Sequence, residues 1–196
     1  MRNDNVKCTQ SVLVKVQDLK KYFDVSPSLL TRVVERKPRA LLKAVDGVSF
    51  EIRRGETLAL VGESGCGKST FLKLLLRFWQ KDSGEIKFGG VDVDSISTDE
   101  LLKNVTMVSQ TTYLFDETIE ENLRIAKPDA TQEEIEAACR MASVHEFILS
   151  LPDGYKTRVG ALGDNLSAGE KQRIGLARAF LRGSEWILLD EPSSTV

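Results

Sequence analysis

The chain has 196 residues, of which 41% are hydrophobic and 29% charged, with a formal net charge of −2; this is an ordinary globular composition. It carries no overall basic field, so we expect no nucleic-acid partner. No apolar run approaches the ~20 residues of a membrane-spanning helix, and residues 1–10 lack the apolar stretch of a secretory signal. Cys8, Cys66 and Cys139 are too widely spaced for a metal or redox motif, which favours a cytoplasmic protein with free thiols.

The first third of the chain is predicted to be rich in strands. Apolar and polar residues alternate at 12–19, a second strand is predicted at 44–52, and 57–62 is an apolar run that ends in glycine, typical of a buried strand. Residues 24–43 contain two prolines and a cluster of basic side chains. We interpret this segment as a solvated surface excursion; the alternative is a basic, leucine-bearing contact with a partner or a membrane surface.

The middle of the chain turns from strands to helices. Helical spacing predicts a helix at 69–79, and short strands are expected at 84–93 around a pair of glycines. Residues 101–110 are predicted to be a helix end that leads into a strand, and 119–150 have helical spacing.

The last third contains the plainest helix signals. Thr131 is predicted to cap a helix over 131–142, because Glu134 lies three residues further on. A second helix is predicted at 167–181 and a buried strand at 185–191. Strands that alternate with helices predict an α/β fold with a mostly parallel sheet.

Residues 62–70 read GESGCGKST, which matches the phosphate-binding pattern G-x-x-x-x-G-K-[ST] between a predicted strand and a predicted helix. Glycines let backbone N–H groups point at phosphate oxygens, and the helix start adds its positive dipole end. Lys68 supplies a cation for the β- and γ-phosphates, and the Ser69 hydroxyl can ligate Mg²⁺. The expected ATP-binding residues of this loop are Gly62, Glu63, Ser64, Gly65, Cys66, Gly67, Lys68, Ser69 and Thr70.

Two acidic residues follow the last predicted strand. Asp190 ends the apolar run WILLD, where a carboxylate can hold Mg²⁺ through water, and Glu191 is placed to polarise an attacking water. An acidic pair can also simply cap a strand, so the interpretation depends on the glycine loop upstream.

The segment LSAGEKQRIGLARAFL at 166–181 closely resembles the signature motif of ATP-binding cassette (ABC) proteins. Together with the glycine loop, with VSQ ending at Gln110 and with ILLDEP, the resemblance extends from about residue 12 to 193. It implies a P-loop NTPase with a RecA-like core, a mostly parallel sheet, an antiparallel β part and an inserted α-helical subdomain.

The resemblance also implies how the chain is divided. Residues 1–196 would form a single, incomplete nucleotide-binding domain. Its core subdomain would comprise about 1–110 and 168–196, and its helical subdomain about 111–167. The family pattern continues beyond the Asp-Glu strand with a further loop, a strand and a switch histidine, which His145 does not match. Hydrolysis is therefore expected to be slow, and His145 is expected to be an ordinary surface or half-buried helix residue.

ABC cassettes work as head-to-tail dimers with ATP at the interface, so the resemblance implies a second nucleotide-binding domain and transmembrane transporter subunits as partners. The chain would then lie in the cytoplasm, on the inner face of the cell membrane. The residues expected to meet the partner's ATP are those of the signature, Leu166, Ser167, Ala168, Gly169 and Glu170.

The family also suggests the roles of individual residues in the ATP site. Glu191 would be the general base, and Gln110 would approach the metal and the attacking water. Ser69, Gln110 and Asp190 would hold Mg²⁺. Phe23 would stack on adenine, although the pair Tyr22-Phe23 could equally belong to the core.

The resemblance is not uniform along the chain. The part up to the glycine loop resembles the ATPases of oligopeptide and dipeptide importers, whereas 89–123 and 146–160 resemble exporter cassettes. Exporters usually have a glutamate where this chain has Ala161, and LSAGE replaces the commoner LSGGQ. The transport direction and the transported substrate stay open. The alternatives to a transporter ATPase are a nucleotide-binding module with little or no hydrolysis, and a soluble ABC protein of DNA repair or translation.

Overall fold

The computed structural model describes residues 11–26, 40–63, 65–109, 111–160 and 163–190. The chain divides into two compact units, Met1–Leu101 and Leu102–Val196, and each unit is described by itself. The first unit is mainly an antiparallel sheet, with a helix that follows the glycine loop. The second combines a parallel strand pair with a group of helices.

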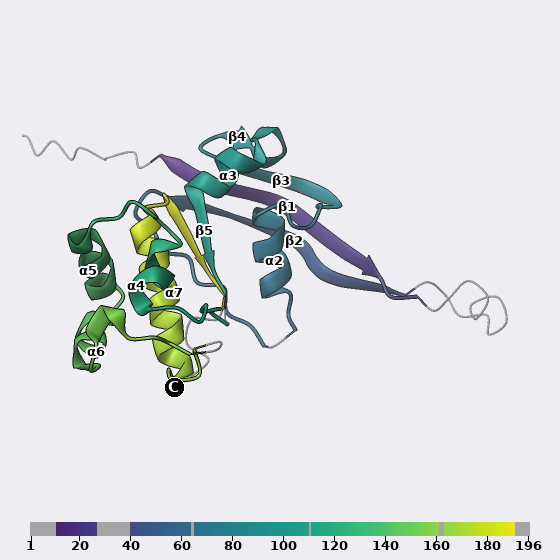
Figure 1. Ribbon diagram of the computed structural model, residues 1–196. Coiled ribbons are helices and arrows are strands. Elements are labelled where there is room, and N and C mark those ends of the chain that lie inside the picture. The colour runs from purple at the N-terminus through teal and green to yellow at the C-terminus, as the bar shows by residue number, and fades with distance from the viewer. Residues whose placement is uncertain (1–10, 27–39, 64, 110, 161–162, 191–196) are drawn as a thin grey trace, which may run out of the picture. The chain divides into compact units, whose positions relative to one another are not determined.

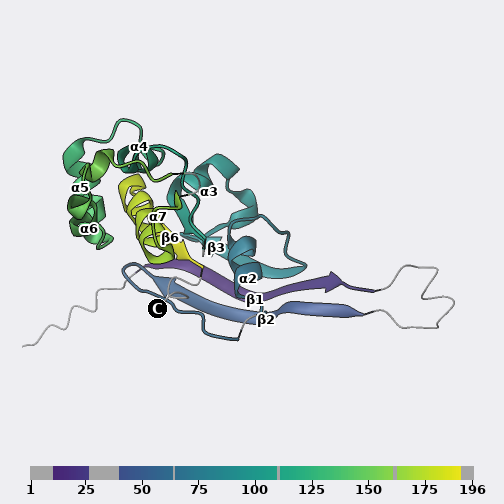
Figure 2. The ribbon, with the colours of Figure 1, turned by 60° about the horizontal axis from the view of Figure 1, so that its bottom comes forward.

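The sheet of the first unit has four strands in the order β2-β1-β3-β4. Its strands are β1 (Val12–Asp24), β2 (Leu41–Arg53), β3 (Ser83–Phe88) and β4 (Val91–Asp92). The strand β1 pairs with β2 along its whole length, whereas its pairing with β3 ends at Lys20. Beyond that point β1 and β2 continue as a two-stranded ribbon, and Figure 2 shows them running side by side.

Helix α2 (Lys68–Leu75) follows the glycine loop in the first unit (Figure 1). One face of α2 is buried, because Phe71, Leu72, Leu74 and Leu75 recur at helical spacing. The ring of Phe71 contacts that of Phe50 on β2, with centroids 5.5 Å apart, so the sheet and the helix share apolar surface. The short helix η1 (Val93–Ser95) follows β4, and α3 (Thr98–Asn104) leads into the second unit.

The second unit contains a parallel pair of strands, β5 (Val105–Val108) and β6 (Trp186–Leu189). Its helices are α4 (Ile119–Arg124), α5 (Gln132–Met141), α6 (His145–Ser150), η2 (Gly154–Lys156) and α7 (Ala168–Arg182). Helices α4 and α5 contact α7, and α6 contacts α5. The core of this unit is apolar and fully buried; it includes Leu114, Ile119, Leu123, Ile135, Ile148 and Ile174.

Most of the predicted elements are confirmed. The strand expected at 12–19 is the first part of β1 and the one at 44–52 is the centre of β2, and the glycine pair before β4 separates two short strands as predicted. Thr131 and Glu134 form a reciprocal capping box at the start of α5, as the sequence predicted. Most of the basic segment at 24–43 lies outside the described residues. No helix in the described ranges is long and apolar enough to cross a membrane.

The segment 57–62 differs from its prediction as a buried strand. It is assigned to no strand, and its apolar side chains are exposed; Val61 is 95% accessible to solvent. A strand needs a neighbour to satisfy its backbone hydrogen bonds, and among the described residues no strand pairs with this segment. Strand β6 is also half-buried to exposed rather than buried, and in the described part of the chain it pairs with β5 alone.

Candidate functional site

The glycine loop ends at Gly67, which caps the N-terminus of α2 in a left-handed conformation, with φ of 94°. A side chain at this position would overlap the backbone oxygen of Ala44 on β2, so the loop passes directly against the sheet. Gly65 also has a positive φ, of 83°. Both positions therefore favour glycine for steric reasons, independently of any ligand.

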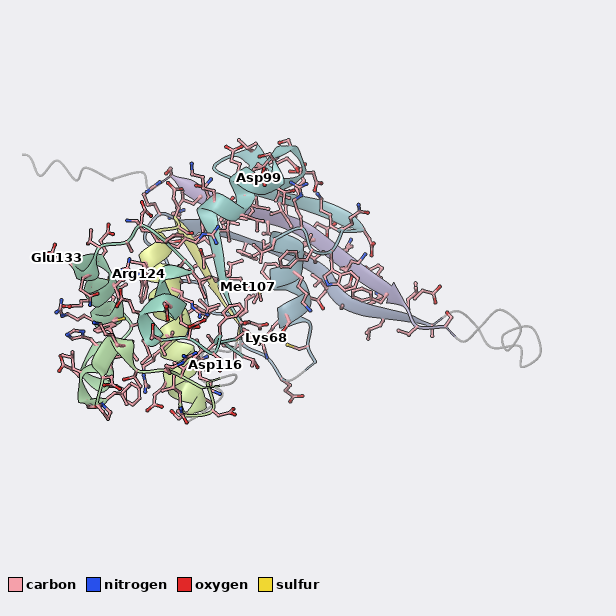
Figure 3. The ribbon with its side chains drawn as sticks, in the orientation of Figure 1. Lys68, Asp99, Met107, Asp116, Arg124 and Glu133 are labelled. Carbon is pink, nitrogen blue, oxygen red and sulfur yellow. The ribbon has the colours of Figure 1, made fainter. Side chains whose placement is uncertain are left out.

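The ammonium group of Lys68 lies within the same loop (Figure 3). Its Nζ donates to the backbone oxygen of Gly62 and, at 3.2 Å, to that of Glu63. The N–H of Cys66 also donates to the Glu63 oxygen, at 3.2 Å, and a side chain at Gly62 would overlap the Cys66 sulfur. The loop thus curls around a cation at the positive end of a helix dipole, which is the arrangement that binds phosphate.

The two aromatic residues near the end of β1 have different surroundings. The Tyr22 hydroxyl donates to Asp46, and Lys43 lies over the Tyr22 ring at 5.5 Å. The half-buried Phe23 makes an edge contact with Trp79, with centroids 5.1 Å apart and planes at 84°. Of these two rings, that of Phe23 is the one that contacts another aromatic ring in the described part of the chain. Phe23 is therefore the better suited of the two to stack on a base.

The signature segment forms the start of α7. Ser167 is the N-cap: its Oγ accepts from the N–H of Glu170, and the Glu170 carboxylate accepts from the N–H of Ser167 at 2.7 Å. Leu166 is buried in the core of the second unit. Ala168 is exposed, and among the residues that the structure describes a side chain at Gly169 would meet only the guanidinium of Arg173, at 3.8 Å. The signature therefore divides into a core residue, a capping pair and two small residues at the surface.

Asp190 directly follows β6. Its N–H donates to the oxygen of Val108 at 2.9 Å, so the parallel pairing of β5 with β6 continues to this residue. The predicted site residues Ser64, Gln110 and Glu191 lie outside the described residues. Ser69, in the first turn of α2, and Asp190 belong to different units, and no group of three metal-binding His, Cys, Asp or Glu side chains occurs within the described ranges. Hydroxyl and carboxylate oxygens are nevertheless the ligands that Mg²⁺ prefers.

A partly buried polar network in the second unit has no counterpart in the sequence prediction. Arg178 on α7 donates from Nε to the backbone oxygen of Asn122 at 2.8 Å, from Nη2 to the Asn122 side chain at 2.7 Å, and from Nη1 to the oxygen of Tyr113 at 2.7 Å. Asn122 is fully buried and also receives the N–H of Phe115 at 2.9 Å. This network joins α7 to α4 and to the chain that follows β5. Burial lowers the pKa of Arg178.

His145 is more buried than the sequence predicted, and it takes part in a polar chain that links α5, α6 and η2. Its Nδ1 lies 2.8 Å from the Tyr155 hydroxyl, and Arg140 lies 3.3 Å from Nε2. Burial raises the pKa of Cys139 to about 11 and also raises the pKa of Tyr155. These groups hold helices together, and His145 has the structural role expected of it, although at a buried position.

Comparison with known proteins gives consistent matches. Residues 45–194 match the family model described as "ABC transporter". The chain is 55% identical over 149 residues to a "Probable ABC transporter ATP-binding/permease protein" of Haemophilus influenzae, a match that covers 76% of this chain and 27% of that protein. It is 49% identical over 150 residues to the multidrug resistance protein pgp-1 of Caenorhabditis elegans, covering 76% of this chain and 11% of that protein.

A solved structure of a bacterial Atm1-family ABC exporter with ATP bound matches with a TM-score of 0.81 and 32% identity, over 94% of this chain and 30% of that one. The chain thus spans less than a third of the length of each of these relatives. The P-loop NTPase fold with an antiparallel β part, predicted from the sequence, is confirmed, as is the nucleotide-binding class. Since the family model covers more than half of the residues, including the glycine loop and the signature, this chain belongs to the ABC transporter family.

Proposed function

We propose that this chain binds ATP and hydrolyses it to power transport across a membrane. The observation that carries the proposal is the loop around Lys68, where the ammonium group sits inside a curl of backbone at the start of α2. A cation, a helix dipole and glycines that allow close approach favour a polyphosphate over other anions.

In this proposal, the loop residues 62–70 bind the β- and γ-phosphates, and Phe23 stacks on the adenine. Ser69, Gln110 and Asp190 hold Mg²⁺, which supplies positive charge to the phosphate oxygens when it is bound. Glu191 accepts a proton from the attacking water while Gln110 orients that water. The water oxygen then bonds to the γ-phosphorus, the bond to the β,γ-bridging oxygen breaks, and ADP and phosphate leave.

The signature residues are proposed to act on ATP bound to a second nucleotide-binding domain. The small residues Ala168 and Gly169 support this, because Ala168 is exposed and, among the described residues, a side chain at Gly169 would meet only the guanidinium of Arg173. Ser167 would contribute its hydroxyl. Leu166 and Glu170 would act indirectly, Leu166 through the core and Glu170 through the helix cap.

The other proposed partners are transmembrane subunits or domains of a transporter, which would place the chain on the cytoplasmic face of the membrane. The Haemophilus relative is named an ATP-binding/permease protein, and the solved relative is an exporter. These names favour export as the direction. None of the reported relatives favours a soluble protein of DNA repair or translation, and the transported substrate is left unspecified.

The test is to measure Mg²⁺-ATP binding and turnover by the full chain and by two variants, Lys68→Ala and Glu191→Gln. We expect Lys68→Ala to lose binding, whereas Glu191→Gln should retain binding and lose turnover. Binding that survives Lys68→Ala undiminished would contradict the proposal. Equal turnover in Glu191→Gln and the parent would instead favour a nucleotide-binding module without hydrolysis of its own.

A further inference from the structure

Trp79 and Phe23 form an aromatic pair within the first unit. Their ring centroids are 5.1 Å apart and their planes are nearly perpendicular, at 84°, which is a favourable edge-to-face geometry. Trp79 remains 44% exposed and Phe23 is half-buried, so the pair is accessible from solvent. Trp79 belongs neither to the phosphate-binding motif nor to the signature.

The chain on both sides of Trp79 is held in place. After α2, Arg77 adopts a left-handed conformation with φ of 58°, and its guanidinium donates to the backbone oxygen of Val93 at 3.2 Å. The N–H groups of Phe78 and Trp79 turn back to the oxygen of Lys73, at 2.8 and 3.3 Å. These hydrogen bonds fix the turn that contains Trp79 at the end of α2.

Asp82 ties the other side of Trp79 to β1. Its carboxylate accepts from the N–H of Tyr22 at 2.6 Å and from Lys21 Nζ at 3.0 Å, and its N–H donates to the oxygen of Lys20 at 3.0 Å. Lys21 Nζ also lies over the Phe23 ring, 5.4 Å from the centroid. Trp79 and Lys21 together restrict the orientations that the Phe23 ring can adopt.

The strand register places this pair beside the phosphate-binding loop. Phe23 lies opposite Leu42 on β2, and Ala44, two residues further along β2, is the residue against which Gly67 packs. Two residues of a strand span roughly 7 Å. A single nucleotide can therefore extend from the loop around Lys68 to the ring of Phe23.

We propose that Trp79 is a positioning residue for the base of a bound purine nucleotide. This inference rests on the proposed function, because it concerns the same ATP site. The Trp79 ring holds the Phe23 ring in one orientation before the base arrives, so that less side-chain freedom is lost when the base stacks. The ligand class is a purine nucleoside triphosphate or diphosphate, and inorganic polyphosphate gains nothing from this pair.

The test compares the binding of ATP with that of inorganic tripolyphosphate, both with Mg²⁺, by calorimetry on the full chain. Trp79→Ala is expected to raise the Kd for ATP about three- to tenfold, the change expected for the loss of an aromatic pair, and to leave the Kd for tripolyphosphate unchanged. Trp79→Phe should restore ATP binding. Phe78→Ala is the matched control: Phe78 is in the same turn and 62% exposed, and its removal should change neither Kd.

Three outcomes would overturn the inference: an unchanged Kd for ATP in Trp79→Ala, an equal loss for both ligands, or no rescue by Trp79→Phe. If the parent chain binds neither ligand, the proposed function itself fails. Trp79 fluorescence in a Trp186→Phe background gives a second measurement that does not require Trp79→Ala to fold. ATP should change this emission and tripolyphosphate should not; the same response to both ligands, or none to ATP, would also overturn the inference.

Discussion

The two helices that begin at predicted ATP contacts, α2 and α7, start in opposite ways. Helix α2 begins after Gly67, which is left-handed and has no side chain with which to cap the helix. Helix α7 begins after Ser167, which is extended and forms a reciprocal capping box with Glu170. The difference lies in the residue that precedes each helix.

The start of α2 is suited to an external anion, whereas side chains of the chain itself supply hydrogen-bond acceptors at the start of α7. The first N–H groups of any helix need acceptors. At α7 the capping box supplies acceptors from the chain itself, whereas at α2 the loop geometry suits phosphate oxygens. We therefore expect nucleotide to stabilise the start of α2 and to have little effect on the start of α7 in the isolated chain.

The largest expected effect is that of Gly67→Ala. The new methyl group would overlap the oxygen of Ala44 and would force a positive φ on alanine, so the loop must move. We expect ATP binding to weaken on the order of 100-fold, because the backbone N–H groups would no longer converge on the phosphates. Calorimetric titration with Mg²⁺-ATP measures this. A Kd within a few-fold of the parent would show that the loop conformation is not required.

Arg178→Met tests what holds α7 in place besides its cap. The substitution removes three hydrogen bonds and leaves the buried Asn122 short of a partner, so we expect the free energy of unfolding to fall by about 2–4 kcal/mol. Urea unfolding followed by circular dichroism measures the loss. Arg182→Met is the matched control on the same helix, because Arg182 is exposed and its guanidinium donates to the backbone oxygen of Leu102 at 2.7 Å. Equal losses in both variants would contradict the importance of the network.

Glu170→Ala and Glu170→Gln test the capping box itself. Alanine removes the acceptor for the Ser167 N–H, which should cost about 1 kcal/mol. Glutamine retains an acceptor oxygen at the same reach, so its stability should stay close to that of the parent. The same urea measurement distinguishes the two. A glutamine variant as unstable as the alanine variant would mean that the charge of Glu170, rather than the cap, matters.

Gly169→Ala is the counterpart of Gly67→Ala at the other helix, and it has the smallest expected effect on the isolated chain. Gly169 lies within α7, where alanine is favoured and the new methyl group has room. We expect the chain to become more stable by about 0.5–1 kcal/mol. ATP binding should be unchanged, whereas turnover that depends on a second domain should fall. A loss of stability would show that the surroundings of Gly169 are tighter than the structure indicates.

The features that the sequence predicted well are local ones. Thr131 and Glu134 are three residues apart, and their capping box depends on no other part of the chain. The glycine loop is likewise defined by consecutive residues, whereas its packing against Ala44 is known only from the structure. The prediction of a strand at 57–62 rested on composition alone, whereas strand formation also needs a paired neighbour distant in sequence.

The network of Arg178 and Asn122 could not be predicted for a related reason. The two residues are 56 positions apart, and neither belongs to a motif with a known spacing. Similarly, Trp79 is an ordinary aromatic residue in the sequence. It meets Phe23 only because β1 pairs with β2 and with β3, the strand that follows Trp79. Contacts of this kind depend on the assembled fold rather than on local pattern.

The central claim, that the loop at the start of α2 binds ATP, is tested most directly by thermal unfolding of the full chain with and without Mg²⁺-ATP. A ligand at ~100 times its Kd adds about 2.7 kcal/mol to stability, which gives a clear rise in Tm. We predict this rise for the parent chain and for Gly169→Ala, and little or none for Gly67→Ala. No shift in the parent, or an equal shift in Gly67→Ala, would contradict the account.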